Sequence, residues 1–407
     1  MTSFDAVAVA RPDSSAWSLH ALREYRLARL REQMMANDLA GMVLFDSVNL
    51  RYATDTTNMQ VWGHHNPVRY AFVAAQGPVI VFDATTMLHL YEGFDLIDEL
   101  RPCIPWTYFT AGPRFEENAK AWAATIADLV REHGGGNKRL GVDRINPFGV
   151  WALEREGIQV VEGQGIIEHA RVIKSHDELC AMRCAIATAE DGMERMREGL
   201  HPGASEREVW SILHKRNIEL GGEWLEGALF CSGPRTNPWF KEASDRRIEN
   251  GDIVAFDTDL IGNYGYCADI SRSWICGDAK PTAEQDYLYK TAIEHLDINM
   301  AMVKAGLTFG EFAEKSENLP DRFRRQQYVC AAHGIGMCDE YPQILYWRDY
   351  KNFGFDGVLE AGMTICVESY VGEVGGREGI KVEQQILVTE GGYELLSKYP
   401  IELLNSR

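Results

Sequence analysis

The 407-residue sequence has no run of apolar residues long enough to cross a membrane. It starts MTSFDAVAVARPD, in which Asp5 interrupts a short apolar run and no basic segment comes first. We therefore expect no signal peptide. Basic residues are also scarce, since 41 Lys and Arg stand against 60 Asp and Glu, giving a formal net charge of −19. Nucleic acids and anionic membranes bind basic patches, so neither is an expected partner.

Paired cysteine motifs, short repeats and glycine-rich phosphate loops are missing as well. The nine cysteines are scattered without a CxxC pair, which predicts reduced thiols in a cytoplasmic protein. Cys180 and Cys184 are one turn apart in a predicted helix, and we interpret them as small packing residues rather than as a metal or redox pair. The apolar content of 45% is ordinary for a globular protein.

The pattern of apolar residues changes near Ile173, and we predict two domains, 1–172 and 173–407. In the first, the amphipathic stretch LREYRLARLREQMMANDLA predicts a helix followed by the buried strand GMVLFD, and RYAFVAAQGPVIVFDA predicts a hairpin. This domain is expected to be α/β. In the second, long helical stretches bracket strands such as DIVAFDTDLI and GIKVEQQILVT, which predicts an α+β domain.

Acidic residues recur inside the predicted strands of the second domain. Asp257 and Asp259 are two residues apart, so we expect them to share one face of a strand, and Asp269 follows on the returning strand. Glu368 and Glu383 each stand among apolar strand residues. Any one of them could belong to a solvated polar face. Five together would be costly to bury without a cation.

Carboxylates with one imidazole suit one or two divalent transition-metal ions. His333 in AAHGIGMCDEYP is the candidate imidazole. The segments DIVAFDTD, YCADISRSW, AAHGIGM, LEAGMTICVES and GIKVEQQILVT together resemble the metal-binding pattern of the creatinase, methionine aminopeptidase and aminopeptidase P superfamily. That resemblance implies the pita-bread fold, two pseudo-symmetric α+β halves around a central site. The metal ligands that it implies are Asp257, Asp259, Asp269, His333, Glu368 and Glu383.

The superfamily has one aspartate where this chain has two, so whether Asp257 or Asp259 is the principal ligand stays open. GMVLFDSVNLRYATDT resembles the creatinase-type N-terminal domain, which is associated with dimers, and implies a homodimer.

The chain departs from the superfamily's peptidases at their additional histidines. Trp239 and Phe240 lie where one is expected, Glu340 stands seven residues after His333, and Val329 stands four residues before it. No histidine follows His333. These differences argue against peptide hydrolysis. The absence of a histidine near Trp239 and Phe240 also argues against creatine hydrolysis.

The stretches HGIGMCDEYP and FCSGPRTNPWF most resemble the DddP-type dimethylsulfoniopropionate (DMSP) lyases of this superfamily. The resemblance implies Asp339 as catalytic base, Tyr328 as a neighbouring active-site residue and iron as the metal. β-Elimination needs a base, and a desolvated carboxylate can serve. Aromatic faces suit the zwitterionic substrate's sulfonium group. The candidate substrate-binding residues are Trp62, Trp239, Phe240 and Tyr341.

Alternatives stay open at this point. A metallopeptidase of the Xaa-Pro type with an unusual proton shuttle and a non-catalytic pita-bread binding module are the competing functions. Asp339 could instead form a salt bridge or cap the loop before Pro342. Trp62, beside His64 and His65, could reach the active site of a dimer partner or lie on a surface loop.

Overall fold

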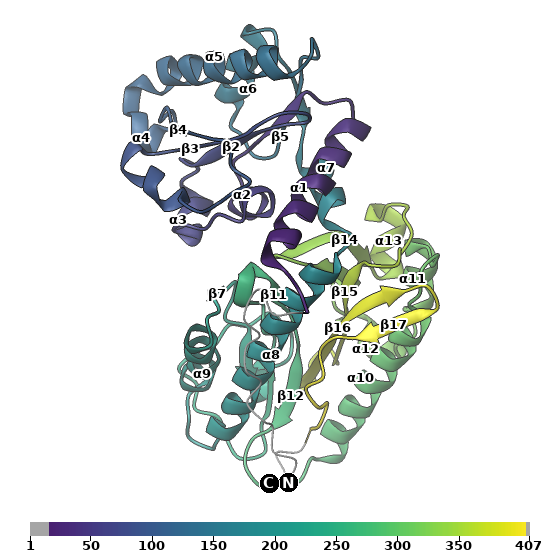
Figure 1. The fold of residues 1–407 in the computed structure, drawn as a ribbon. Helices are drawn as coiled ribbons and strands as arrows, with labels where there is room; N and C mark the ends of the chain where they lie inside the picture. Colours follow the sequence, from purple (N-terminus) through teal and green to yellow (C-terminus); the bar gives the residue numbers. More distant parts are fainter. Residues whose placement is uncertain (1–15, 404–407) are drawn as a thin grey trace. The chain divides into compact units, whose positions relative to one another are not determined.

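The computed structural model describes residues 16–403. The chain forms two compact units, Ser15–Arg171 and Val172–Arg407 (Figure 1). The first 15 residues, where no signal peptide is expected, lie outside the described residues. Within the described part, no helix is long and apolar enough to span a membrane.

The N-terminal unit is built on a mixed six-stranded sheet of order β4-β3-β2-β1-β5-β6. The predicted hairpin is confirmed, because β2 and β3 pair antiparallel. The strands are β1 (Gly41–Leu44), β2 (Tyr70–Ala74), β3 (Val79–Asp83), β4 (Glu99–Pro102), β5 (Arg139–Val142) and β6 (Gln159–Glu162). The helices are α1 (Leu19–Ala36), α2 (Ser47–Thr54), α3 (Gln60–His65), α4 (Tyr108–Ala111), α5 (Phe115–His133), α6 (Pro147–Arg155) and α7 (Gln164–Arg171), with 3₁₀ turns η1 (Thr85–Tyr91) and η2 (Gly112–Arg114).

The three longest helices of the C-terminal unit begin at well-defined capping residues. Ser175, Ser205 and Thr282 each form a capping box at the start of a helix, which satisfies backbone donors that the first turn leaves unpaired. The helices are α8 (His176–Gly199), α9 (Glu206–Glu219), α10 (Ala283–Met302), α11 (Phe309–Lys315), α12 (Asp321–Arg324) and α13 (Trp347–Phe353), with 3₁₀ turns η3 (Gly233–Arg235) and η4 (Asn263–Gly265).

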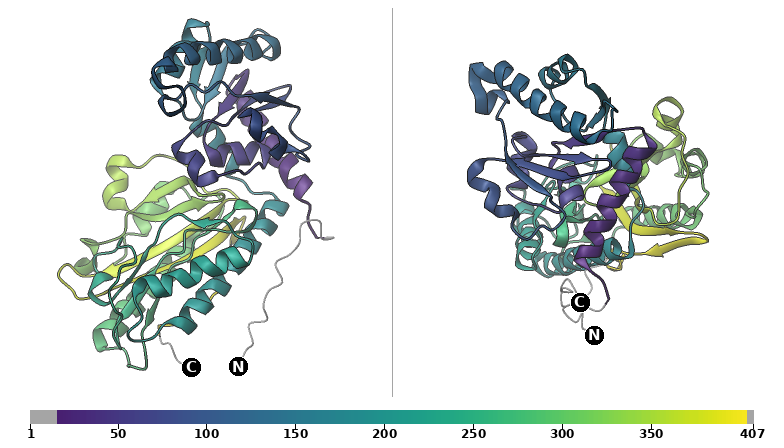
Figure 2. Two further views of the ribbon diagram at one scale, coloured as in Figure 1. Left: turned by 90° about the vertical axis from the view of Figure 1, so that its left-hand side faces the viewer. Right: turned by 45° about the horizontal axis from the view of Figure 1, so that its top comes forward.

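Three antiparallel sheets complete this unit, in the orders β14-β13-β15-β16-β17, β12-β9-β8 and β11-β10-β7. The strands are β7 (Trp224–Leu225), β8 (Phe230–Ser232), β9 (Ile253–Phe256), β10 (Leu260–Ile261), β11 (Cys267–Ala268), β12 (Arg272–Ile275), β13 (Cys330–Ile335), β14 (Asp339–Leu345), β15 (Thr364–Gly372), β16 (Gly379–Thr389) and β17 (Gly392–Leu395). Figure 2 shows the long yellow strands of this unit running between its helices.

The helix α10 packs on β15 and β16 and gives these two strands a buried apolar backing. Leu288, Ala292 and Leu296 of α10 share a core cluster with Val367 of β15 and Val382 of β16. Side chains alternate along a strand, so the residues next to these valines point to the opposite face. Glu368 and Glu383, which pair across β15 and β16, lie on that opposite face.

Candidate metal centre and active site

Three adjacent strands bring the predicted histidine and both predicted glutamates together. Glu368 of β15 pairs directly with Glu383 of β16 across the ladder, and β13 carries His333 on the other side of β15. His333 Nε2 lies 3.4 Å from Glu368 Oε1 and 3.4 Å from Glu383 Oε1. All three residues are buried, so these polar groups converge in a site largely removed from water.

The three aspartates lie at breaks between short strands. Asp257 and Asp259 fall between β9 and β10, and Asp269 falls between β11 and β12. The expectation that the first two lie on one regular strand is wrong, because β9 ends at Phe256 and Asp259 has a left-handed backbone with φ of 37°. Asp257 joins the two glutamates in one possible cation-binding group, whereas Asp259 joins Asp269 and Asp339 in another.

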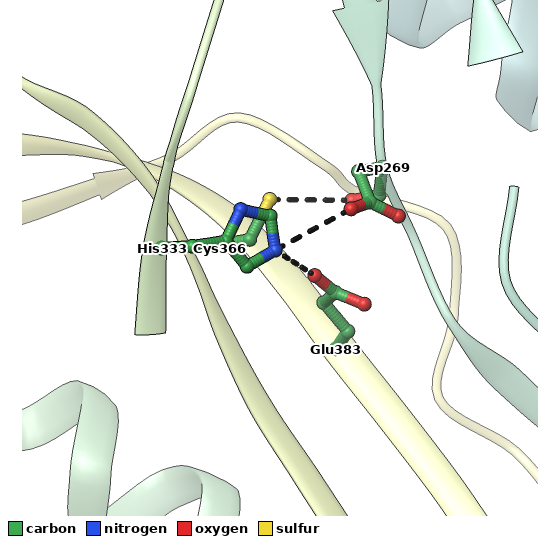
Figure 3. A group of neighbouring side chains, drawn as sticks. All are labelled: Asp269, His333, Cys366 and Glu383. Carbon is green, nitrogen blue, oxygen red and sulfur yellow. Dashed lines mark hydrogen bonds and ion pairs between the residues drawn. The ribbon is translucent and has the colours of Figure 1, made fainter. Parts of the chain in front are cut away.

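A third group consists of Asp269, His333, Cys366 and Glu383, whose candidate ligand atoms all lie within 4.8 Å of one another (Figure 3). His333 Nε2 points between the carboxylates of Asp269 and Glu383 (Figure 3), at 3.5 Å from Asp269 Oδ2. His333 Nδ1 lies 3.0 Å from the Gly334 carbonyl. An N–H at Nδ1 would donate to this carbonyl and leave Nε2 with its lone pair, as a metal ligand requires.

The donor set fits a divalent cation. Asp269 Oδ1 and Glu383 Oε1 are buried and accept no hydrogen bond from any described residue. Burial and the surrounding carboxylates raise the pKa of Asp259 and of Asp269 well above the ordinary value. Burial raises the pKa of Glu368 to about 7. Burial is the larger cause in each case, so ionising these carboxylates is costly here, and a bound cation would lower that cost.

One lysine supplies part of the missing positive charge. Lys381 is fully buried, and its Nζ lies 2.8 Å from Asp257 Oδ2 and 2.9 Å from an oxygen of both Glu368 and Glu383. Ser271 Oγ lies 2.6 Å from Asp257 Oδ1 and 2.7 Å from Glu383 Oε2, and its one proton can be donated to either carboxylate. Burial alone would raise the pKa of Glu383, but Lys381 and His333 hold it below its ordinary value.

Sequence reasoning missed Lys381, Ser271 and Cys366. Each stands two residues from a predicted ligand, namely Glu383, Asp269 and Glu368. On an extended chain that spacing places side chains on the same face. Examining positions two residues before and after each ligand would have found all three.

Aromatic rings border the cluster on the Lys381 side. The Lys381 ammonium lies 4.7 Å from the Tyr328 ring centroid and 5.8 Å from that of Trp239. Phe240 stacks on Tyr328 at 5.1 Å and is 56% exposed. Burial and the nearby Glu368 raise the pKa of Tyr328 above its ordinary value, so this phenol stays protonated. Three of the predicted active-site residues therefore form one wall.

Asp339, the predicted base, stands at the entrance to the cluster. Its Oδ1 lies 3.6 Å from His333 Nδ1, and its side chain is 57% exposed. The carboxylate is thus more hydrated than the desolvated base expected from the sequence. Glu340, the next residue, is buried and forms an ion pair with Lys174.

Tyr341 and Trp62 have surroundings of their own. Tyr341 contacts Phe309 and Phe355 at ring centroid separations of 6.0 and 5.5 Å. Trp62 belongs to the N-terminal unit, where it contacts Phe109 at 6.3 Å and lines a cavity of about 160 Å³. Their part in substrate binding stays a prediction.

Two family models match the chain. The model of metallopeptidase family M24 matches residues 180–390, and that of the creatinase/prolidase N-terminal domain matches residues 26–173.

Individual relatives match over almost the full length. The dimethylsulfoniopropionate lyase DddP of Roseovarius nubinhibens is 45% identical over 389 residues, which cover 94% of this chain and 87% of that protein. The protein of the same name from Roseobacter denitrificans is 41% identical over the same shares. Among solved structures, an Xaa-Pro dipeptidase from Bacillus anthracis superposes with a TM-score of 0.75 at 23% identity, covering 94% of this chain and 99% of that one. The last similarity establishes the fold.

Proposed function

We propose that this chain, which belongs to metallopeptidase family M24 and has a creatinase/prolidase N-terminal domain, catalyses the metal-dependent cleavage of DMSP to dimethyl sulfide and acrylate. The observation that carries the proposal is the match to two proteins named as DMSP lyases, 45% and 41% identical over 94% of this chain. The geometry of the site supports the same chemistry.

Asp339 is the proposed base. Its carboxylate borders a buried cluster of ligand atoms and is open to an incoming substrate. It would take the proton from the carbon next to the substrate carboxylate. The electrons of that C–H bond form the new double bond, and the C–S bond breaks with its electron pair leaving on neutral dimethyl sulfide. A substrate seated over Asp339 would also remove its water and strengthen it as a base.

The proposed metal ligands are carboxylates and one imidazole that come together from five separate segments of the chain. They are Asp257, Asp259, Asp269, His333, Glu368 and Glu383. Oxygen donors with one imidazole suit iron or a similar divalent transition metal, in one or two positions. The chemistry that such an ion supplies when bound is Lewis-acid stabilisation of the negative charge that develops on the substrate carboxylate.

The aromatic wall would hold the sulfonium end of the substrate. Phe240 and Tyr328 stack on each other, and the face of Phe240 is accessible. Each aromatic face contributes about 0.5–2 kcal/mol to binding of a cation. Trp239 lies on the same wall, close to Lys381. We further propose that the protein is a homodimer. Trp62 of the N-terminal unit is a candidate to bind substrate in the active site of the partner subunit.

The competing functions fit the site less well. Glu340, at the position of a peptidase histidine, is buried against Lys174 and is poorly placed to exchange a proton with a substrate. A non-catalytic binding module would have no need for a full set of candidate ligand residues, five of the six buried.

The test is headspace gas chromatography of dimethyl sulfide from purified, metal-replete enzyme supplied with DMSP. Wild type should release the sulfide. Asp339→Asn should lower kcat by about 10²- to 10⁴-fold without losing metal. His333→Ala should lose both the activity and the bound metal. Asp321→Asn, at a side chain that is 93% exposed, is the control. No sulfide from metal-replete wild type would refute the proposal. Release of proline from Xaa-Pro dipeptides would then favour the metallopeptidase function instead.

A further inference from the structure

The residue that follows the proposed base in the sequence belongs to a buried ion pair. Lys174 Nζ donates to Glu340 Oε1, and the two side chains are only 2% and 1% exposed. Glu340 follows Asp339 at the start of β14, and the first four residues of that strand alternate between more exposed and buried. Consecutive side chains of a strand point to opposite faces. Holding Glu340 on one face therefore directs Asp339 to the other, where His333 and the metal cluster lie.

The Glu340 carboxylate also packs against the turn between β13 and β14. A Cβ added at Gly336 would come within 2.5 Å of both carboxylate oxygens. The same turn is held from another direction, because Cys267 N donates to Gly336 O at 2.7 Å. Glycine at this position lets the carboxylate approach the turn closely, so the ion pair and the turn form one packed assembly.

The lysine is anchored to a different part of the sheet. Lys174 N donates to Gly362 O at 3.0 Å, and Ile173 forms an isolated bridge with Met363, just before β15 begins. Glu368 lies on β15 a few residues further along. The Lys174–Glu340 pair thus connects the hairpin that carries the proposed base to the start of a strand that carries a proposed metal ligand.

Stability alone gives little reason for two buried charges at this place. The cost of removing both from water often cancels their attraction, and an apolar pair of similar volume is commonly as stable. What a buried charged pair adds is a fixed place, because moving the carboxylate away from the ammonium would leave two unpaired charges out of water. A base that must face one C–H bond requires such a fixed place.

We propose that Lys174 and Glu340 are positioning residues, which hold the β13–β14 turn so that the Asp339 carboxylate faces the metal cluster and the substrate. The inference rests on the proposed function in one respect, the role of Asp339 as base. It predicts that neutralising the pair slows proton abstraction while leaving substrate binding and metal content intact.

The test compares wild type with Lys174→Met, Glu340→Gln and the double variant, which buries no unpaired charge. Arg216→Met is the control, because it removes an ion pair to Asp191 between α8 and α9, away from the proposed site residues. Each protein is assayed for melting temperature, metal content, kcat, KM and the isotope effect on kcat with DMSP deuterated beside the carboxylate. The single variants should melt at lower temperature, and the double variant should recover most of that loss.

The kinetic readouts separate positioning from folding. In the double variant, kcat per metal-loaded enzyme should fall about 10- to 100-fold, KM should stay within about twofold, and the isotope effect should rise as proton transfer becomes slower. The control should keep the wild-type kcat and isotope effect. A double variant with wild-type kcat and isotope effect would overturn the inference.

A crystal structure of the double variant gives a readout that needs no activity. The separation between His333 Nδ1 and Asp339 Oδ1, 3.6 Å in the native chain, should increase, and an unchanged separation would also overturn the inference. If wild type releases no sulfide, the proposed function fails, and this structural readout still decides whether the pair positions Asp339.

Discussion

Lys381→Met offers a direct probe of how the site's negative charge is balanced. The substitution keeps most of the side chain's length and removes an ammonium that is fully buried. Asp257, Glu368 and Glu383 would lose the lysine that lies within 2.9 Å of each of them. We expect the metal-free protein to be strongly destabilised and the metal-loaded protein to be affected less.

The magnitude follows from the three short contacts. A pair of unit charges 2.9 Å apart attracts by about 6 kcal/mol at an effective dielectric constant of 20, so three pairs give about 17 kcal/mol in gross terms. Desolvation of the ammonium and repulsion among the carboxylates offset most of this. Removing one partner from a buried ion pair typically costs about 3–5 kcal/mol net. For a domain of this size, that loss lowers the melting temperature by roughly 6–20 °C.

The assay is thermal unfolding of chelator-treated and metal-replete protein, each for wild type and variant. Bound metal stabilises the folded state, and the gain in melting temperature on adding metal should be larger in the variant. Lys290→Met is the matched control, since it removes the same charge from an exposed pair with Asp286 and should change stability by less than about 1 kcal/mol. If metal-free Lys381→Met melted within a few degrees of wild type, our account of charge balance would be refuted.

Three further changes test a buried histidine of α10 and two parts of the site. Burial lowers the pKa of His295 to about 4, below the 6.5 of an unfolded chain, so its contribution to stability is complete above pH 6.5 and is lost as the pH falls through 4. The loss totals about 3 kcal/mol, and His295→Gln should flatten the fall in melting temperature over that range; an unchanged slope would contradict the assignment. Glu383→Gln should reduce bound metal by more than half in elemental analysis, whereas full occupancy would show that this carboxylate is no ligand. Phe240→Ala should raise KM for DMSP about two- to fivefold. It should weaken inhibition by an uncharged analogue, in which carbon replaces the sulfur of DMSP, by a smaller factor. Equal effects on DMSP and on the analogue would exclude a cation–π contribution.

The sequence predicted best where a residue's neighbours restricted its surroundings. Glu368 and Glu383 stand within runs of strand-forming apolar residues, and the structure places both on one buried face. The hairpin of β2 and β3 followed from two apolar runs with a Gly-Pro turn between them. Alternation and turn chemistry are local properties, so a single sequence carries them.

Other features depended on irregular backbone that no periodic pattern predicts. Asp257 and Asp259 were expected on one strand, but β9 ends at Phe256 and the two residues belong to different groups of candidate ligands. Lys381 was overlooked because acids alone were sought, although a lysine within an apolar strand raises the same question as Glu383 does. The exposure of Asp339 depends on how the hairpin turn packs against other segments, which local sequence does not determine.

The two acidic residues that follow the His333 strand differ in role because a strand alternates. Asp339 is open to a substrate, whereas Glu340 is neutralised by Lys174. A carboxylate at position 340 facing the metal cluster would have added another negative charge to a site that already holds more carboxylates than it balances. Turned away and paired, it adds no such charge and can fix the direction of its neighbour. At the position where the superfamily resemblance implies a peptidase histidine, this paired glutamate has no proton to give a substrate, and in the proposed mechanism it supports Asp339, the carboxylate base that an elimination requires.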